Sequence, residues 1–392
     1  MKKILCMTLA AITLMASECN PDPIPIPSIF DAGDGSATNP YVITTATQLD
    51  LVREDMTAHY KLGGNIDLTG YLKSTGAGFS KWSTAGWLPI GDGYGFFTGG
   101  FDGAGYKITG LTINRPSSQF VGLFNSISSS SAYIKNLGVE GVNITGDIYV
   151  GGVVGYIDNV SITNCYVTGT VKGNRSVGGV VGQDNNGIIT NCYAISTVNG
   201  NVGVGGLVGR ENGGSITKSY TTGAVTGNEC VGGVAGELNN SGSITNCYAL
   251  GAVNGSDGYV GGVVGYFYSG SMTNCYATGE VSGANFVGGI AGYGLGIITN
   301  CVALSKFINR TSPYSGTYFG RVVGVNEGTL TNNWAYSGIT ASGGITYSTG
   351  GINGANCAEI PTRIWWISFP GTGPNWSSSD WTFVDGQYPK LK

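Results

Sequence analysis

The sequence predicts an all-β protein: a parallel β-helix, or β-solenoid, built from coils of about 27 residues with a cap at each end. Three observations carry this prediction. A hydrophobic-glycine unit recurs in register, apolar and polar residues alternate within each unit, and 69 of the 392 residues are glycine. Alternating segments punctuated by glycine are typical of short strands joined by turns, and a steady period of this length is typical of stacked units.

The repeating unit reads Val-Gly-Gly-hydrophobic-x-Gly and is followed by Ile-Thr-Asn-Cys-Tyr or a variant. Its valines are 27, 27, 27, 29 and 27 residues apart, at Val150, Val177, Val204, Val231, Val260 and Val287. Each unit has room for three short strands and three turns, which is one coil of a parallel β-helix. One coil buries too little apolar surface to be stable alone, so the coils must stack.

At the usual spacing between strands, about nine coils between Phe97 and Asn333 would form a rod on the order of 40 Å long. We expect the coils to be right-handed, because connections between parallel strands nearly always are. The open ends of such a rod expose unpaired strand edges, so both ends should be capped.

The first 19 residues are typical of an export signal. Two lysines precede an apolar run from Ile4 to Met15, which is too short to cross a bilayer. The end of the signal looks like that of a bacterial lipoprotein, which predicts lipidation of Cys19 and a place on the cell surface or outer membrane. Ordinary secretion is the alternative, because Glu18 stands where lipoprotein signals prefer a small residue. Residues 20–28 are predicted to be a proline-rich tether.

The remaining chain divides into three parts. We expect residues 29–120 to form the N-terminal cap and the first coils, residues 121–334 the repeat solenoid, and residues 335–392 an aromatic-rich C-terminal cap. The segment 53–60 around His59 is predicted to be helical. The tryptophans near the C-terminus are predicted to plug the last coil, with a binding knob as the alternative; they are Trp334, Trp365, Trp366, Trp376 and Trp381.

Composition and motifs argue against several classes of function. A net charge of −4 without clusters of Lys or Arg argues against nucleic-acid binding. The sequence has one histidine, His59, and contains no G-x-S-x-G, P-loop or H-E-x-x-H motif. Polysaccharide lyases and hydrolases also use parallel β-helices, but they need clustered ionisable groups. We therefore expect no catalytic residue, and a glycan-cleaving enzyme is the alternative.

One column of the repeat holds five cysteines: Cys165, Cys192, Cys247, Cys275 and Cys301. Ser219 and Asn333 occupy the same column in other coils. Disulfides or paired metal ligands would not tolerate these replacements. The column therefore predicts a buried, reduced ladder, while Cys230 and Cys357 lie outside it and are expected to be free.

The next column holds tyrosines: Tyr166, Tyr193, Tyr220, Tyr248 and Tyr276. Since side chains alternate along a strand, inward cysteines would place these tyrosines outward. A stripe of phenol rings is suited to binding sugar rings or a protein partner. A ladder that only stabilises the sheet is the alternative.

Four acidic residues follow the final glycine of successive units by one to three residues: Asp158, Asp184, Glu211 and Glu237. If they line one edge of the solenoid together with neighbouring asparagines, their oxygens are suited to Ca²⁺. The alternative is that Asp and Asn occur there as turn residues. No other cofactor is expected.

The recurring Val-Gly-Gly unit followed by Ile-Thr-Asn-Cys-Tyr resembles the GLUG repeat of bacterial cell-surface proteins. The same repeat occurs in non-catalytic parts of some immunoglobulin-A peptidases. The resemblance covers about Val121 to Trp334 and implies a surface adhesin that binds a glycan or a host surface protein. Contact with the membrane is expected only through the lipid anchor. A purely structural spacer is a further alternative.

Overall fold

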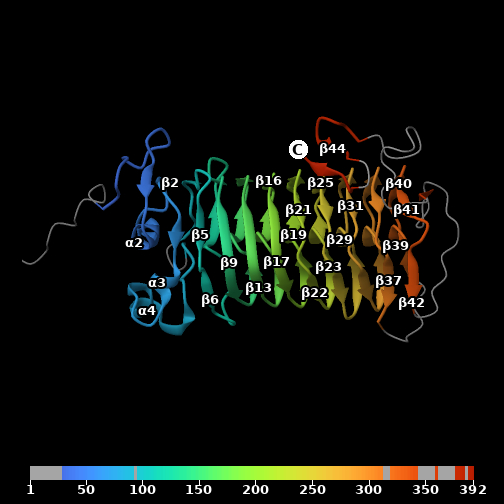
Figure 1. Cartoon of the computed structure of the whole chain (residues 1–392), viewed down its shortest axis with the longest axis horizontal. Coiled ribbons are helices and arrows are strands. Elements are labelled where there is room, and N and C mark those ends of the chain that lie inside the picture. Colours follow the sequence, from blue (N-terminus) through green and yellow to red (C-terminus); the bar gives the residue numbers. More distant parts are fainter. Residues whose placement is uncertain (1–28, 92–94, 312–317, 343–357, 361–375, 385–386) are drawn as a thin grey trace, which may run out of the picture.

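The structure is a computed structural model that describes residues 29–91, 95–311, 318–342, 358–360, 376–384 and 387–392. Within these residues the chain winds into one parallel β-solenoid, as predicted, with short helices at its N-terminal end (Figure 1). The predicted signal, the tether, Cys19, Cys357, Trp365 and Trp366 lie outside the described residues. In the described part of the chain, no helix is long and apolar enough to cross a membrane.

Each repeat coil contributes to four sheets, which we name A, B, C and D, and not to three as expected. One coil runs through β12 (Ser161–Thr163) in sheet A, β13 (Tyr166–Lys172) in sheet B, β14 (Arg175–Gly178) in sheet D and β15 (Val181–Asn185) in sheet C. The additional strand arises because the Gly-Gly unit forms a sharp corner between β14 and β15. The sequence pattern had been interpreted as a single strand there.

Equivalent strands of successive coils build the four sheets. Sheet A contains β1 (Tyr41–Ile43), β2 (His59–Leu62), β4 (Gly100–Asp102), β8 (Tyr133–Lys135), β12, β16 (Ile188–Thr190), β20 (Ser215–Thr217), β25 (Ser243–Thr245), β30 (Ser271–Thr273), β35 (Ile297–Thr299) and β40 (Thr329–Thr331). Sheet D contains β10 (Ile148–Val150), β14, β18 (Val202–Gly205), β23 (Glu229–Gly232), β28 (Gly258–Gly261), β33 (Asn285–Gly288) and β38 (Phe319–Gly320). Sheet C contains β7 (Phe124–Ser128), β11 (Val154–Asp158), β15, β19 (Val208–Asn212), β24 (Ala235–Asn239), β29 (Val264–Phe267), β34 (Ala291–Gly294) and β39 (Val323–Asn326).

Sheet B is divided into two short strands per coil along much of its length. It contains β3 (Ile66–Asp67), β5 (Lys107–Thr109), β6 (Thr112–Asn114), β9 (Gly138–Thr145), β13, β17 (Tyr193–Asn199), β21 (Tyr220–Thr221), β22 (Val225–Gly227), β26 (Tyr248–Ala249), β27 (Val253–Gly255), β31 (Tyr276–Ala277), β32 (Val281–Gly283), β36 (Val302–Ala303), β37 (Phe307–Arg310), β41 (Trp334–Tyr336), β42 (Thr340–Ser342) and β43 (Ala358–Ile360).

Successive coils pair in parallel and in the register that the repeat predicts. The Cα partners in sheet D link Val150, Val177, Val204, Val231, Val260 and Val287 in turn. Where a coil is longer, the additional residues lie in the turns, so that the strands keep their pairing. The same side chain therefore recurs directly above itself along the rod.

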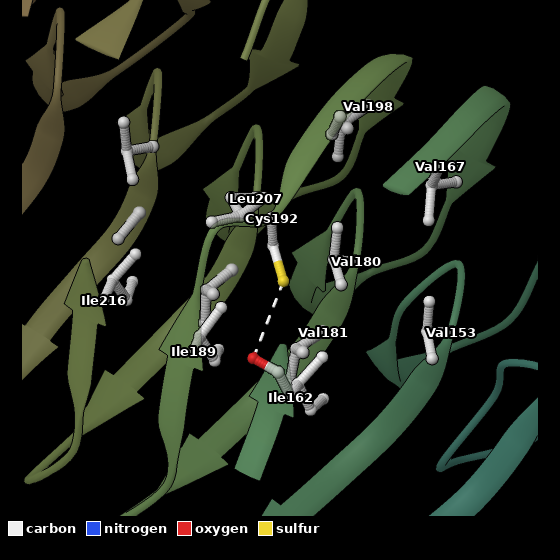
Figure 2. Packing of buried hydrophobic residues seen from close by; sticks show 14 of the residues in the cluster. Val153, Ile162, Val167, Val180, Val181, Ile189, Cys192, Val198, Leu207 and Ile216 are labelled. Carbon is white, nitrogen blue, oxygen red and sulfur yellow. Dashed lines mark hydrogen bonds between the residues drawn. The ribbon is translucent and has the colours of Figure 1, made fainter. Parts of the chain in front are cut away.

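The interior is filled by aliphatic and cysteine side chains from all four sheets. Figure 2 shows Val153, Val180 and Leu207, which occupy the same position in successive coils, packed near Ile162 and Cys192. These side chains are essentially inaccessible to solvent. Because no coil has enough apolar surface to enclose its own side chains, the core exists only through stacking.

The three glycines of each unit lie where backbones approach too closely for a side chain. A Cβ atom on Gly205 would be 1.9 Å from the Val208 carbonyl oxygen, at the corner between sheets D and C. On Gly206 it would be 2.2 Å from the Gly233 oxygen of the next coil, and on Gly209 it would be 2.3 Å from the Ser176 carbonyl carbon. Backbone packing thus explains the Val-Gly-Gly-hydrophobic-x-Gly pattern.

Short helices cap the N-terminal end: α2 (Ala46–Asp50), α3 (Thr69–Leu72) and α4 (Ala77–Trp82), with the 3₁₀ turns η2 (Leu51–Glu54) and η3 (Ser83–Ala85). The helix predicted around His59 is wrong. Only the start of that segment lies in η2, and His59 opens strand β2, because Tyr60 and Leu62 alternate into the core. The His59 ring nitrogen Nδ1 lies 3.4 Å from the Tyr133 hydroxyl.

The C-terminal segment folds back along the side of the rod (Figure 1). Its strands β44 (Trp381–Thr382) and β45 (Lys390–Leu391) form an antiparallel pair. Trp376 and Trp381 belong to an apolar cluster that is separate from the solenoid interior and includes Tyr276 of sheet B. The expectation that these two tryptophans plug the last coil is therefore wrong: they cover an outer face.

The Gly-Gly corner is testable with a matched pair of substitutions. Gly205→Ala should lower the free energy of unfolding by roughly 2–3 kcal/mol, because its Cβ atom would overlap backbone that cannot rotate away. Gly258→Ala serves as the control, since its Cβ atom would lie no closer than 3.6 Å to another atom, and should change stability by about 0.5 kcal/mol or less. Urea unfolding followed by circular dichroism measures both; equal effects would contradict the explanation.

Candidate functional site

The predicted tyrosine column forms a regular ladder on sheet B. Ring centroids of Tyr166, Tyr193, Tyr220, Tyr248 and Tyr276 are 4.8, 4.9, 4.8 and 4.9 Å apart, and neighbouring planes differ by 2° to 7°. Each inner ring therefore has both faces covered by its neighbours. What the ladder can offer a ligand is a row of ring edges and hydroxyl groups.

The C-terminal segment covers one end of this ladder and leaves the other uncovered. Tyr248 is 7% exposed and Tyr276 is 1% exposed, whereas Tyr166, Tyr193 and Tyr220 remain partly exposed. We call these three residues the uncovered rungs. The Tyr166 hydroxyl donates to Glu140 Oε1 at 2.7 Å, and burial together with this bond raises the pKa of Tyr166 to about 12.

Aromatic packing and specific polar contacts hold the C-terminal segment on the ladder. The Trp381 ring centroid lies 5.8 Å from that of Tyr276, and the Tyr276 hydroxyl donates to the Pro389 carbonyl at 2.6 Å. Lys218 Nζ lies 2.9 Å from Asp380 Oδ1. Asn246 binds two residues of this segment: it donates to Asp380 Oδ2 at 3.2 Å and accepts from Trp381 Nε1 at 3.3 Å.

Lys218 interrupts a second ladder, made by the asparagines of Ile-Thr-Asn-Cys-Tyr. These residues lie in a left-handed turn, with φ near +54°, and their side-chain amides hydrogen-bond from coil to coil. The members are Asn136, Asn164, Asn191, Asn246, Asn274, Asn300 and Asn332. Sequence reasoning missed the role of Lys218, although its departure from the repeat in Ile-Thr-Lys-Ser-Tyr was the available signal.

The four acidic residues do not form the single edge that was predicted. Asp158 pairs in register with Asn185, Asp184 pairs with Glu211, and Glu237 pairs with Arg210, so they occupy three different columns of sheet C. These residues follow the final glycine of their unit by one, two or three residues. They therefore differ in column, because a shift of one residue turns a strand side chain to the opposite face. Across the described ranges, no group of three or more His, Cys, Asp or Glu could hold a metal ion.

Asp184 and Glu211 point into the core, where both are fully buried. Gly187 N–H donates to Asp184 Oδ1 at 2.7 Å, and Gly214 N–H donates to Glu211 Oε1 at 2.6 Å. Burial raises the pKa of Asp184 to about 6 and raises that of Glu211 well above its usual range. The two carboxyl groups occupy paired positions of sheet C, and each influences the pKa of the other.

The cysteine column forms the predicted buried ladder, and its members Cys165, Cys192, Cys247, Cys275 and Cys301 are free thiols. Burial raises the pKa of Cys165 and Cys247 well above the usual range. The polar replacements fit because they are hydrogen-bonded: Ser219 Oγ accepts from Cys192 N at 3.1 Å, and Asn333 Oδ1 accepts from Cys301 N at 2.8 Å. Cys230 is also free and buried.

The length of one coil agrees with that of a known sequence motif. The GLUG motif matches residues 146–172, 173–199, 227–254 and 256–282. Four of the repeats are GLUG motifs. The first GLUG segment runs through β10, β11, β12 and β13, so one motif corresponds to one full coil of the solenoid.

Two proteins have sequences similar to part of this chain. The chain is 39% identical over 144 residues to a protein of Evansella cellulosilytica provisionally named a Gly-rich membrane protein, and 32% identical over 148 residues to halomucin of Haloquadratum walsbyi. The matches cover 34% and 36% of this chain but only 16% and 2% of those proteins.

A solved structure from Bacteroides ovatus, provisionally named an immunoglobulin A1 protease, is 20% identical with a TM-score of 0.45. The comparison covers 93% of this chain and 95% of that one.

The buried carboxyl pair makes stability depend on pH. The pKa values of Asp184 and Glu211 are raised in the folded state. The folded protein therefore binds more protons than the unfolded chain from about pH 4 to beyond pH 6. The free energy of unfolding should therefore fall as pH rises through this window, by about 1.4 kcal/mol per unit for each proton retained. Asp184→Asn with Glu211→Gln should flatten this slope in urea titrations, whereas Glu280→Gln, at an exposed residue outside this pair, should keep it.

Packing of the C-terminal segment can be tested through Trp381. Trp381→Ala should remove about 3 kcal/mol from the docking of residues 376–384 and 387–392, because a nearly fully buried indole is lost. We expect faster proteolysis within this segment, while the circular dichroism of the solenoid is unchanged. Val384→Ala is the control, since Val384 is 47% exposed. Loss of the solenoid signal in the Trp381 variant would show that the segment is part of the main folding unit.

Proposed function

We propose that the protein is a non-catalytic ligand-binding solenoid displayed at the cell surface, and that its uncovered rungs contact a protein partner. A β-solenoid of GLUG repeats is the framework. The predicted export signal supports a surface location, as does the name of the Evansella relative, which designates a membrane protein. The lipid anchor on Cys19 remains part of the proposal.

The partial covering of the tyrosine ladder is the observation that carries this proposal. Tyr248 and Tyr276 already bind an aromatic protein segment of the same chain, and the uncovered rungs present the same side chains in the same register. A protein segment with aromatic or apolar side chains is thus favoured as the ligand. Sugar rings are less favoured, because they stack on aromatic faces and those faces are occupied by neighbouring tyrosines.

The burial of the acidic pair supports a non-catalytic role. Asp184 and Glu211 carry the raised carboxyl pKa values that acid–base chemistry would use, yet neither is accessible to a substrate. His59 lies beside Tyr133, at the opposite end of the rod from the C-terminal segment. A glycan-cleaving enzyme is the less favoured alternative. In a purely structural spacer, the uncovered rungs would have no binding role.

Binding can be tested with purified residues 28–392 on protein and glycan arrays, in calcium and in chelator. We expect retention on a defined protein. The variant Tyr166→Ser, Tyr193→Ser, Tyr220→Ser should weaken it by about tenfold or more, because contact area at the centre of an interface is lost. Tyr106→Ser is the control, since Tyr106 is exposed and outside the ladder.

Each outcome separates the alternatives. Retention that the triple variant keeps would contradict a role for the ladder, and retention on glycans alone would replace the protein ligand by a sugar. Loss of binding in chelator would show that binding needs a divalent cation. Release of oligosaccharides from any arrayed polysaccharide would favour the enzyme, and no retention at all would favour the spacer.

A further inference from the structure

A second aromatic surface lies at the corner between sheets D and C, and we call it the aromatic corner. Tyr259, Phe286 and Tyr318 stack in one column, with ring centroids 4.9 and 4.8 Å apart. Tyr266 and Tyr293 stack beside them at 5.5 Å. Edge contacts join the two columns, since the Tyr259 ring lies 4.9 Å from that of Tyr266 and at 64° to it.

The repeat itself shows that the fold does not need these rings. The first column lies one residue before the paired residues of sheet D. Phe120 and Tyr149 carry rings there in earlier coils, but the three coils between have Ser176, Gly203 and Cys230. The second column has Tyr156 in an earlier coil and then Gln183, Arg210 and Glu237. The aromatic corner also belongs to neither apolar cluster of the protein. Aromatic side chains here are therefore not explained by packing of the solenoid.

The backbone conformation at Tyr259 and Phe286 makes aromatic residues unusual at these two positions. Tyr259 and Phe286 have φ values of +60° and +53°, in the left-handed region that bulky side chains rarely adopt. The same turn recurs at Ser176, Gly203 and Cys230, with φ values of +51°, +69° and +54°, so the left-handed backbone belongs to the fold. The rings of Tyr259 and Phe286 on this turn are partly exposed.

The aromatic corner is exposed and bordered by carboxylates. Tyr318 is 47% exposed, and Tyr268, whose ring lies 6.2 Å from that of Tyr266, is 53% exposed. A hydrogen bond with the Glu327 carboxylate raises the pKa of Tyr293 to about 12. Burial and the nearby thiol of Cys230 and carboxylates of Glu229 and Asp257 raise the pKa of Tyr259.

Arg210 of the second column pairs with Glu237, with 3.4 Å between Nε and Oε2. This pair leaves Glu229, Asp257 and Glu327 as additional negative charges around the rings. A surface that combines aromatic rings with an excess of carboxylates has the electrostatic character that attracts cations.

We propose that the aromatic corner binds a cationic protein segment, with arginine or lysine side chains lying against the exposed rings of Tyr318 and Tyr268 and near the carboxylates. A guanidinium group suits this surface best, because it is planar, weakly hydrated and able to pair with a carboxylate while it contacts an aromatic ring. This surface is separate from the tyrosine ladder, which is built from sheet B. It adds a second binding face to the rod and does not depend on the function of the ladder.

The test uses purified residues 28–392 and a fluorescent peptide of alternating glycine and arginine. The variant Tyr259→Ser, Phe286→Ser, Tyr293→Gln introduces the residues that the same columns carry at Ser176 and Gln183, so the solenoid should fold as before. We expect fluorescence anisotropy to show affinity about tenfold lower in the variant. Affinity of the wild-type protein should also fall with added salt.

Matched controls make the assignment specific. Tyr106→Ser removes an exposed tyrosine outside both columns and should leave peptide affinity unchanged. A peptide of alternating glycine and glutamate should not bind. Equal affinity of the wild-type protein and the triple variant, at equal thermal midpoints, would overturn the proposal. So would equal binding of the acidic peptide, an equal loss in the control variant, or no binding of the arginine peptide.

Discussion

Close backbone contact at the glycine corners is the constraint on which the rest of the structure depends. A Cβ atom on Gly205 or Gly206 would overlap a carbonyl oxygen of its own or the next coil, so the coils can stack in register only because side chains are absent there. In-register stacking then brings every column of the repeat directly above itself. The core, the outer ladders and the exposed surfaces all follow from this single spacing.

Repetition makes departures from the repeat informative. Where a column is uniform, as with the tyrosines and asparagines, the side chain stacks on its own copy and stabilises the rod. Where it is not, another interaction has replaced the stacking: Lys218 leaves the asparagine ladder and binds Asp380. Asp184 and Glu211 replace apolar residues in a core column, where burial raises the pKa of both carboxyl groups. The rings of Tyr259 and Phe286 stand where three preceding coils have Ser176, Gly203 and Cys230.

The C-terminal segment connects packing with the proposed function. It is held by aromatic contacts to Tyr276 and by polar contacts to Lys218 and Asn246. The outer face of sheet B can therefore bind a protein segment of suitable chemistry, and part of this face is left uncovered. A rod with a tyrosine ladder on one sheet and an aromatic corner between two others is well suited to contact more than one partner along its length.

The sequence by itself determined the solenoid, its period, its register and the buried cysteine and outward tyrosine columns, because each depends only on local alternation and on a repeat length that stacking must respect. It did not determine the fourth sheet. It also did not determine that the side chains of Asp184 and Glu211 point into the core, since a shift of one residue after the last glycine is enough to exchange the two faces of a strand. Only the tertiary structure decided which tyrosines are covered, because that depends on where residues 376–392 return to the rod, a contact between positions more than a hundred residues apart.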